Sequence, residues 1–118
     1  MSTSLKTILQ DNHLAAWNER NREQRDQLLS TIYADNIEMH DAGLTVKGRK
    51  AISDFIGKLH AEDDKFVFSA LSPIEFIHNG GRFFGKIQTK DGILNSMDFF
   101  VVENDKVVTI YAFLSPAS

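Results

Sequence analysis

The stretch that decides the fold runs from residue 93 to residue 115 and reads ILNSMDFFVVENDKVVTIYAFLS. Side chains alternate between the two faces of a strand. Two apolar runs, Ile93–Glu103 and Lys106–Leu114, meet at the turn residues Glu-Asn-Asp, which predicts an antiparallel hairpin. Both faces of this hairpin are apolar, whereas a half-solvated antiparallel sheet alternates with polar residues. One face therefore packs on helices, and the other needs a cover.

The segment before this hairpin continues the same sheet. The turn sequence at residues 78–81 (HNGG) separates a strand over Phe66–Ile77 from a strand over Arg82–Lys90, and the turn at residues 90–92 (KDG) connects the latter to the strand that begins at Ile93. Pro73 cannot donate a hydrogen bond to a neighbouring strand, so we expect a bulge or bend in the first of them. The second half of the chain is therefore predicted to be a four-stranded antiparallel meander.

The first half of the chain has helical periodicity. One helix is expected up to Trp17, a second after a capping Asn21, and a third over Arg49–His60, with a strand over Ile37–Asp41. The predicted buried positions of the three helices are Leu5, Ile8, Leu9 and Ala16; Leu28, Leu29, Ile32 and Tyr33; and Ile52, Phe55, Ile56 and Leu59. Helices followed by a meander predict an α+β fold in one domain over residues 1–118.

Composition excludes several function classes. The chain has no cysteine, which excludes disulfides, zinc–thiolate sites and thiol catalysis. Its net charge is −3 without a basic block, so no nucleic-acid partner is expected. The first residues lack the apolar core of a signal peptide, and no apolar run is long enough to span a membrane. A cytoplasmic location and no membrane partner are the default expectation.

Two aspartates lie in apolar company. On the predicted strands Asp41 shares a face with Ile37 and Met39, and Asp98 shares one with Leu94 and Phe100. Buried carboxyl groups are rare unless they are paired, and two of them in different environments can serve as acid and base in one site. The structural alternatives are a turn made by the side chain of Asp41 and a hydrogen bond from Asp98 to a buried backbone group or Tyr hydroxyl.

The histidines give a weaker signal. His13 lies on the apolar stripe of the first helix, where a histidine is more often a hydrogen-bonded core residue than a functional one. His40 shares the opposite, polar face of its strand with Glu38. The histidine spacings do not match a helical metal site, so neither a metal nor another cofactor is expected.

Four segments in order carry a family resemblance. They are HLAAWNERN (13–21), IYADNIEMHDAG (32–43), VKGRKAISDFIGKL (46–59) and the hairpin at 93–115. Together they resemble the SnoaL-like branch of the nuclear transport factor 2-like superfamily, which includes polyketide cyclases and ketosteroid isomerases. The resemblance implies a cone, also described as a cystatin-like α+β roll. In it a curved mixed sheet wraps around the three helices and an apolar pocket opens at one end.

The same resemblance implies a site. Asp41 matches the general base of the isomerases, and Asp98 matches their neutral hydrogen-bond donor. Those isomerases have a Tyr on the first helix, where this chain offers His13 or Trp17; His13 is expected to be an auxiliary donor or orienter. The expected pocket walls are Trp17, Tyr33, Phe55, Leu59, Phe100, Ile110 and Leu114.

The function expected from these residues is cofactor-free removal of a proton next to a carbonyl group. It would lead to isomerisation or cyclisation of an apolar small molecule. A non-catalytic ligand-binding or dimerisation module is the alternative. A hydrolase that activates a water molecule in the pocket would need an Arg near the carboxylates. Arg49 and Arg82 are poorly placed for that role, because they are expected at the start of a helix and the start of a strand. A second copy of the chain is the simplest cover for the outer sheet face, which predicts a homodimer.

Overall fold

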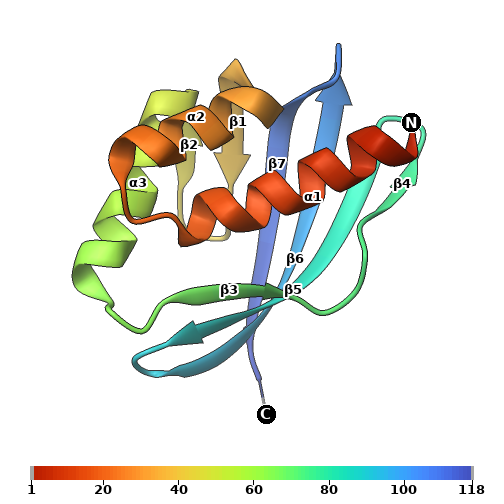
Figure 1. Ribbon diagram of the computed structural model, residues 1–118. Coiled ribbons are helices and arrows are strands. Elements are labelled where there is room, and N and C mark those ends of the chain that lie inside the picture. Colours follow the sequence, from red (N-terminus) through yellow and green to blue (C-terminus); the bar gives the residue numbers. More distant parts are fainter. Residues whose placement is uncertain (1, 118) are drawn as a thin grey trace.

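Three helices cover one face of a single curved sheet (Figure 1). The structure is a computed structural model that describes residues 2–117. The helices are α1 (Thr3–Asn18), α2 (Arg22–Ile32) and α3 (Arg49–Glu62), and α1 runs across the sheet (Figure 1). The side chain of Asn21 accepts a hydrogen bond from the Gln24 backbone N–H at 2.9 Å, as predicted for the cap of the second helix.

The sheet has seven strands in the order β2-β1-β7-β6-β5-β3, with β4 also paired to β5. β1 pairs parallel with β7, and the other pairs are antiparallel, so the sheet is mixed. The α+β class with a curved, unclosed mixed sheet is therefore confirmed. The strands are β1 (Tyr33–His40), β2 (Thr45–Lys47), β3 (Val67–Ala70), β4 (Glu75–Ile77), β5 (Gly80–Thr89), β6 (Gly92–Glu103) and β7 (Lys106–Pro116).

The segment over Phe66–Ile77 differs from the prediction of one bent strand. It forms two separate strands, and both pair with β5: β3 with Gly85–Gln88 and β4 with Gly80–Arg82. Pro73 lies in the connection between them, where its missing N–H leaves no sheet hydrogen bond unmade. Because the segment is broken, β3 and β4 can each pair with a different part of the curved strand β5.

The core lies between the helices and the inner face of the sheet. Its largest fully buried side chains include Tyr33, Phe83 and Phe100, each stabilising the fold by roughly 1.5–3 kcal/mol through removal of apolar surface from water. Tyr33 was predicted on the buried edge of the second helix, but α2 ends at Ile32 and Tyr33 begins β1. The residue is buried as expected, although a strand rather than a helix carries it.

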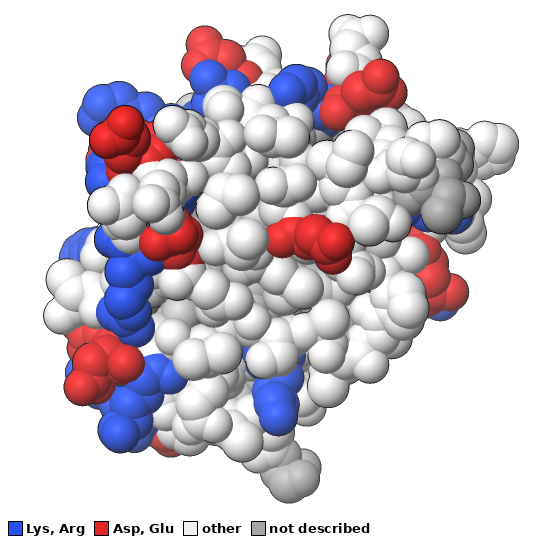
Figure 2. Space-filling view, viewed as in Figure 1, with Lys and Arg blue, Asp and Glu red and all other residues white. Residues whose placement is uncertain are grey.

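The outer face of the sheet is apolar as well. Met97, Phe99, Tyr111 and Phe113 surround a shallow depression there, and Phe113 is 59% exposed. On the helix side, Figure 2 shows Lys and Arg mixed with Asp and Glu and no continuous basic area. Among residues 2–117, no helix is long and apolar enough to cross a membrane.

Candidate active site

A cavity of about 190 Å³ lies between the helix layer and the inner face of the sheet. The sheet side comes from alternate residues of neighbouring strands, because every second side chain of a strand faces inward. The lining residues include His13 and Trp17 of α1, Phe55 and Leu59 of α3, Leu94, Ser96 and Asp98 of β6, and Ile110, Ala112 and Leu114 of β7. An apolar cavity of ~150 Å³ can hold benzene, so this one has room for a single ring with small substituents.

A chain of hydrogen bonds ends at the carboxylate of Asp98. The indole N–H of Trp17 donates to the hydroxyl oxygen of Tyr33 at 2.9 Å. The same oxygen lies 2.6 Å from Nδ1 of His13, and Nε2 of His13 lies 3.0 Å from Oδ2 of Asp98. Tyr33 is fully buried and His13 is nearly so. Residues from α1, β1 and β6 therefore meet at the inner end of the cavity.

The number of hydrogens on each group determines which partner donates in each of these hydrogen bonds. Burial raises the pKa of Tyr33, so its hydroxyl group keeps its single hydrogen. If Nδ1 of His13 carried a hydrogen, the Tyr33 hydroxyl would accept twice, and its own hydrogen would have no acceptor among the described residues. Tyr33 therefore donates to Nδ1, and the hydrogen of His13 is on Nε2. The neutral His13 ring donates to Oδ2 of Asp98, which is therefore the accepting oxygen of this pair.

The second oxygen of Asp98 has no hydrogen-bond partner among the described residues. Asp98 is only 8% exposed, and its Oδ1 accepts no hydrogen bond from residues 2–117. No Lys or Arg is among the described residues that line the cavity. A buried carboxylate normally has a cation or several donors around it. Asp98 has one neutral donor and an unused oxygen in an apolar cavity.

Asp41 has a different environment. Its Oδ1 accepts hydrogen bonds from the backbone N–H groups of Gly43 and Leu44, both at 2.8 Å. This is the turn that was the structural alternative for Asp41. The residue is partly exposed and also lines the cavity, as does Leu114, which is half exposed. Asp41 is thus at the mouth and Asp98 at the inner end, and the roles predicted for the two aspartates stay predictions.

The neighbour of Asp41 lies on the other side of the sheet. His40 stacks on the ring of Tyr111 at a centroid distance of 5.3 Å and bonds the hydroxyl of Thr45 at 2.9 Å. Its Nε2 lies 3.7 Å from a carboxylate oxygen of Glu38. His40 and Glu38 therefore share one face of β1, as predicted, and His40 lies beside Tyr111 of the largely apolar outer face.

Five of the seven predicted wall residues line the cavity: Trp17, Phe55, Leu59, Ile110 and Leu114. Tyr33 and Phe100 do not line it. They are buried behind His13, and the ring of Phe100 lies 4.9 Å from the His13 ring, centroid to centroid. Sequence reasoning missed Ser96 as a lining residue, although strand alternation already placed it on the same face as Asp98.

His60 holds the backbone beside the cavity. It was predicted to end the third helix, but α3 continues to Glu62 and His60 is buried. Its Nε2 donates to the carbonyl oxygen of Trp17 at 2.8 Å. Burial lowers the pKa of His60, which favours the neutral ring. This bond ties α3 to the end of α1, where Trp17 faces the cavity. No group of three His, Cys, Asp or Glu side chains within residues 2–117 could hold a metal ion.

The shape of the molecule matches known structures. The chain has the nuclear transport factor 2-like fold. A SnoaL-like family protein from Agrobacterium tumefaciens, whose isomerase activity is itself a proposal, superposes with a TM-score of 0.84 at 21% identity, over 96% of this chain and 99% of that one. A nuclear transport factor 2-like protein of unknown function from Cytophaga hutchinsonii gives 0.75 at 10% identity, over 98% and 94%.

A third similar structure is from Kribbella flavida and is described as a proposed ketosteroid isomerase. It superposes with a TM-score of 0.79 at 14% identity, over 98% of this chain and 82% of that one. The sequence matches no protein-family model and no curated protein. At these identities the comparisons establish the fold, and the chemistry has to be argued from the cavity.

Proposed function

We propose that this protein is a cofactor-free enzyme that removes a proton from a carbon next to a carbonyl group in a compact apolar molecule. Isomerisation or cyclisation of the substrate would follow. The observation that carries the proposal is the carboxylate of Asp98, whose unused oxygen lies in an apolar cavity. The similar structures described as isomerases agree with this chemistry.

We assign the base to Asp98 rather than to Asp41. A general base needs a free lone pair within reach of the substrate. In our proposal Asp98 acts in its carboxylate form: Oδ2 accepts from the neutral His13, and Oδ1, which has no hydrogen bond within residues 2–117, faces the substrate. His13 is then a positioning residue. In the reaction, Oδ1 takes the proton, the electrons of the C–H bond form the enolate, and the same carboxyl group returns the proton to carbon.

Deuterium exchange tests this assignment without knowledge of the natural substrate. Acetophenone and cyclohex-2-enone fit a cavity of about 190 Å³, and the loss of their exchangeable C–H signals in D₂O can be followed by NMR. Asp98→Asn should slow the catalysed exchange by about 10²–10⁴-fold, the usual contribution of a general base. Asp41→Asn is the matched control, because Asn keeps the side-chain oxygen that makes the turn.

The outcomes separate the candidate functions. A larger loss for Asp41→Asn than for Asp98→Asn would place the base at the mouth, as the family resemblance implies. Binding of both ketones with no catalysed exchange would favour the non-catalytic ligand-binding module.

We also propose that two copies of the chain pair through the outer face of the sheet. Met97, Phe99, Tyr111 and Phe113 form an apolar area across β6 and β7, and large exposed apolar areas mark interaction sites. Sedimentation analysis should show a dimer for the wild type and a monomer for Phe113→Glu. A wild-type monomer at high concentration would contradict this pairing.

A further inference from the structure

Ser96 is a buried polar residue without a partner. It is 5% exposed and lines the cavity. Its hydroxyl oxygen and Nδ1 of His60 are the buried side-chain polar atoms of the described residues that have no hydrogen bond. Buried hydroxyl groups are normally hydrogen-bonded, because an unpaired one loses its hydration without compensation. An apolar residue of the same size would suit the unliganded cavity better, so a partner from outside the chain is expected.

The position of Ser96 relates it to Asp98. The two residues are neighbours on the inner face of β6, two positions apart, which corresponds to a spacing of ~6.6 Å along the strand. Ser96 lies between Asp98 at the inner end and Leu94 on the same face. A ring-sized ligand that contacts Asp98 therefore passes over Ser96.

Gly85 on the neighbouring strand keeps this place open. It pairs with Ser96 across β5 and β6. A Cβ atom at Gly85 would lie 2.5 Å from the ring of Phe68 and 2.9 Å from Oγ of Ser96, which is too close for both. The hydroxyl group of Ser96 thus lies against a residue without a side chain. Because a serine hydroxyl rotates among staggered positions, it can turn from Gly85 to a ligand.

We propose that Ser96 is the hydrogen-bond donor for the carbonyl oxygen of the substrate. This inference rests on the proposed function and completes it. With the acidic carbon at Oδ1 of Asp98, the carbonyl group extends along β6 towards Ser96. The substrate class is then a compact, uncharged ketone or enone whose carbonyl oxygen is two bonds from the carbon that loses its proton.

The chemistry explains why a donor is needed at this place. When the proton moves from carbon to Asp98, the negative charge appears on the carbonyl oxygen. A hydrogen bond to that oxygen becomes stronger as the charge develops, and loss of one such donor can cost about 10²-fold in rate. No Lys or Arg lines the cavity within the described part of the chain. The Ser96 hydroxyl fills this role.

The test compares Ser96→Ala with Thr89→Val. Thr89 also lines the cavity, but its hydroxyl donates its hydrogen to the carbonyl oxygen of Gly92 at 2.7 Å and accepts from the backbone N–H of Asp91 at 3.2 Å, so it has no hydrogen to donate to a ligand. The probes are acetophenone and α-methylstyrene, which replaces the C=O group by C=CH₂. Kd is measured by calorimetric or NMR titration. Ser96→Ala should weaken acetophenone binding by about fivefold relative to α-methylstyrene, the effect of one net hydrogen bond. Thr89→Val should leave this ratio unchanged.

Two further readouts separate a ligand contact from a structural role. Without ligand, the Tm of Ser96→Ala should equal or exceed that of the wild type, because the change removes an unpaired buried hydroxyl. Catalysed exchange of acetophenone should fall by about 10²-fold. A lower Tm with an unchanged binding ratio would show that Ser96 is structural and overturn the inference.

Failure of this inference and failure of the proposed function have different signatures. Normal exchange in Ser96→Ala would overturn the role of Ser96 and leave Asp98 as the base. If Ser96→Ala alters the binding ratio but the protein catalyses no deuterium exchange of a ketone, the proposed enzymatic function is wrong. Ser96 would then still be a hydrogen-bond donor to a bound ligand.

Discussion

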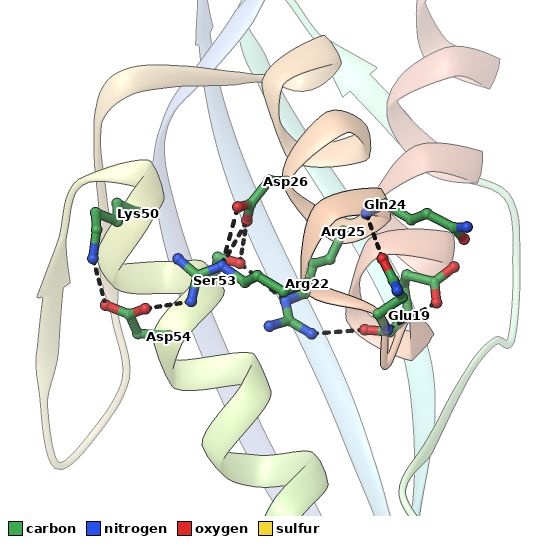
Figure 3. Close-up of polar contacts among 9 residues, drawn as sticks. Glu19, Arg22, Gln24, Arg25, Asp26, Lys50, Ser53 and Asp54 are labelled. Carbon is green, nitrogen blue, oxygen red and sulfur yellow. Dashed lines mark hydrogen bonds and ion pairs between the residues drawn. The ribbon is translucent and has the colours of Figure 1, made fainter.

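Two polar networks of this molecule pair their carboxylates in different ways. The helix network joins α2 to α3 through Arg22, Arg25, Asp26, Ser53 and Asp54 (Figure 3). The cavity network joins α1, β1 and β6 through His13, Trp17, Tyr33 and Asp98. In the helix network Arg22 contacts both carboxylates, Asp26 at 3.0 Å and Asp54 at 2.5 Å. In the cavity network the carboxylate contacts a neutral ring.

The buried cation of the helix network has partners within the chain as well. Arg25 is 3% exposed, and it donates to Oγ of Ser53 at 3.0 Å and to the carbonyl oxygen of Glu19 at 2.9 Å. Ser53 in turn donates to Asp26. Gly57 leaves room for the guanidinium group, because a Cβ atom there would be 3.0 Å from its nitrogen. The carboxylates of the helix network have partners within the chain, whereas one oxygen of Asp98 has none among residues 2–117. We expect the first network to serve stability, and the second is the one that carries the proposed function.

Loss of Arg25 should have the largest effect on stability. We expect Arg25→Met to lower the free energy of unfolding by about 2–3 kcal/mol, because it leaves buried groups of Ser53 and Glu19 without their donor. Urea denaturation measures this. Arg22→Met is the control; its side chain is 43% exposed, so its loss should cost less than about 1 kcal/mol. An equal decrease in the free energy of unfolding for the two variants would show that burial does not determine the contribution of each arginine.

Loss of the Tyr33 hydroxyl should have the next largest effect. Tyr33→Phe leaves the N–H of Trp17 and Nδ1 of His13 without a partner, at a cost of about 1–2 kcal/mol. In the variant, Nδ1 of His13 no longer accepts a hydrogen bond from Tyr33, so the ring hydrogen is no longer restricted to Nε2. The ¹⁵N chemical shifts of the His13 ring should show a single Nε2–H form in the wild type and a mixture in Tyr33→Phe. Unchanged shifts would mean that the contact with Asp98 alone keeps the ring hydrogen on Nε2.

Protonation of Asp26 at low pH should have the smallest of the three effects on stability. Burial acts to raise the pKa of Asp26, but hydrogen bonds from Ser53 and Arg22 lower it below its usual value. A carboxyl group whose folded-state pKa is depressed stabilises the protein above its unfolded pKa of ~3.9 and loses this effect as the pH falls through the folded value. Asp26 is half exposed, so the contribution is below about 1 kcal/mol.

The corresponding measurement is urea unfolding between pH 3 and pH 6. Asp26→Asn should flatten the loss of stability below pH ~4. The same slope in wild type and variant would assign the acid sensitivity to other groups, such as His60, whose pKa is lowered by burial.

Local rules predicted most of the fold. The turn at residues 103–105 is present, where Asn104 and Asp105 adopt positive φ angles of 52° and 64°. Strict alternation fails in β7, because a bulge at Val108 brings Val107 to the inner face. Alternation alone cannot reveal such a bulge, because the extra residue leaves no mark on the apolar pattern of a strand that is apolar on both faces.

The site was predicted only as a set of residues. Strand alternation placed Asp98 and Ser96 on one face, and helical periodicity turned His13 inward. The contact between His13 and Asp98 joins the first helix to the sixth strand, and no local pattern encodes it. The direction of the hydrogen bonds depends on Tyr33, whose hydroxyl lies in the core rather than in the cavity wall. The direction of the hydrogen bond from His13 to Oδ2 of Asp98 therefore follows only from the neighbours of His13.

The parallel pairing of β1 with β7 has a consequence for the rate of folding. Tyr33 lies opposite Val107, so this pairing closes a loop that contains α3 and five strands. Distant pairings of this kind are slow to form, because the chain loses loop entropy before the contact stabilises it. The hairpins of β5, β6 and β7 are local and can form first. We expect the β1–β7 pairing, and with it the closure of the cavity, to be the late event in refolding.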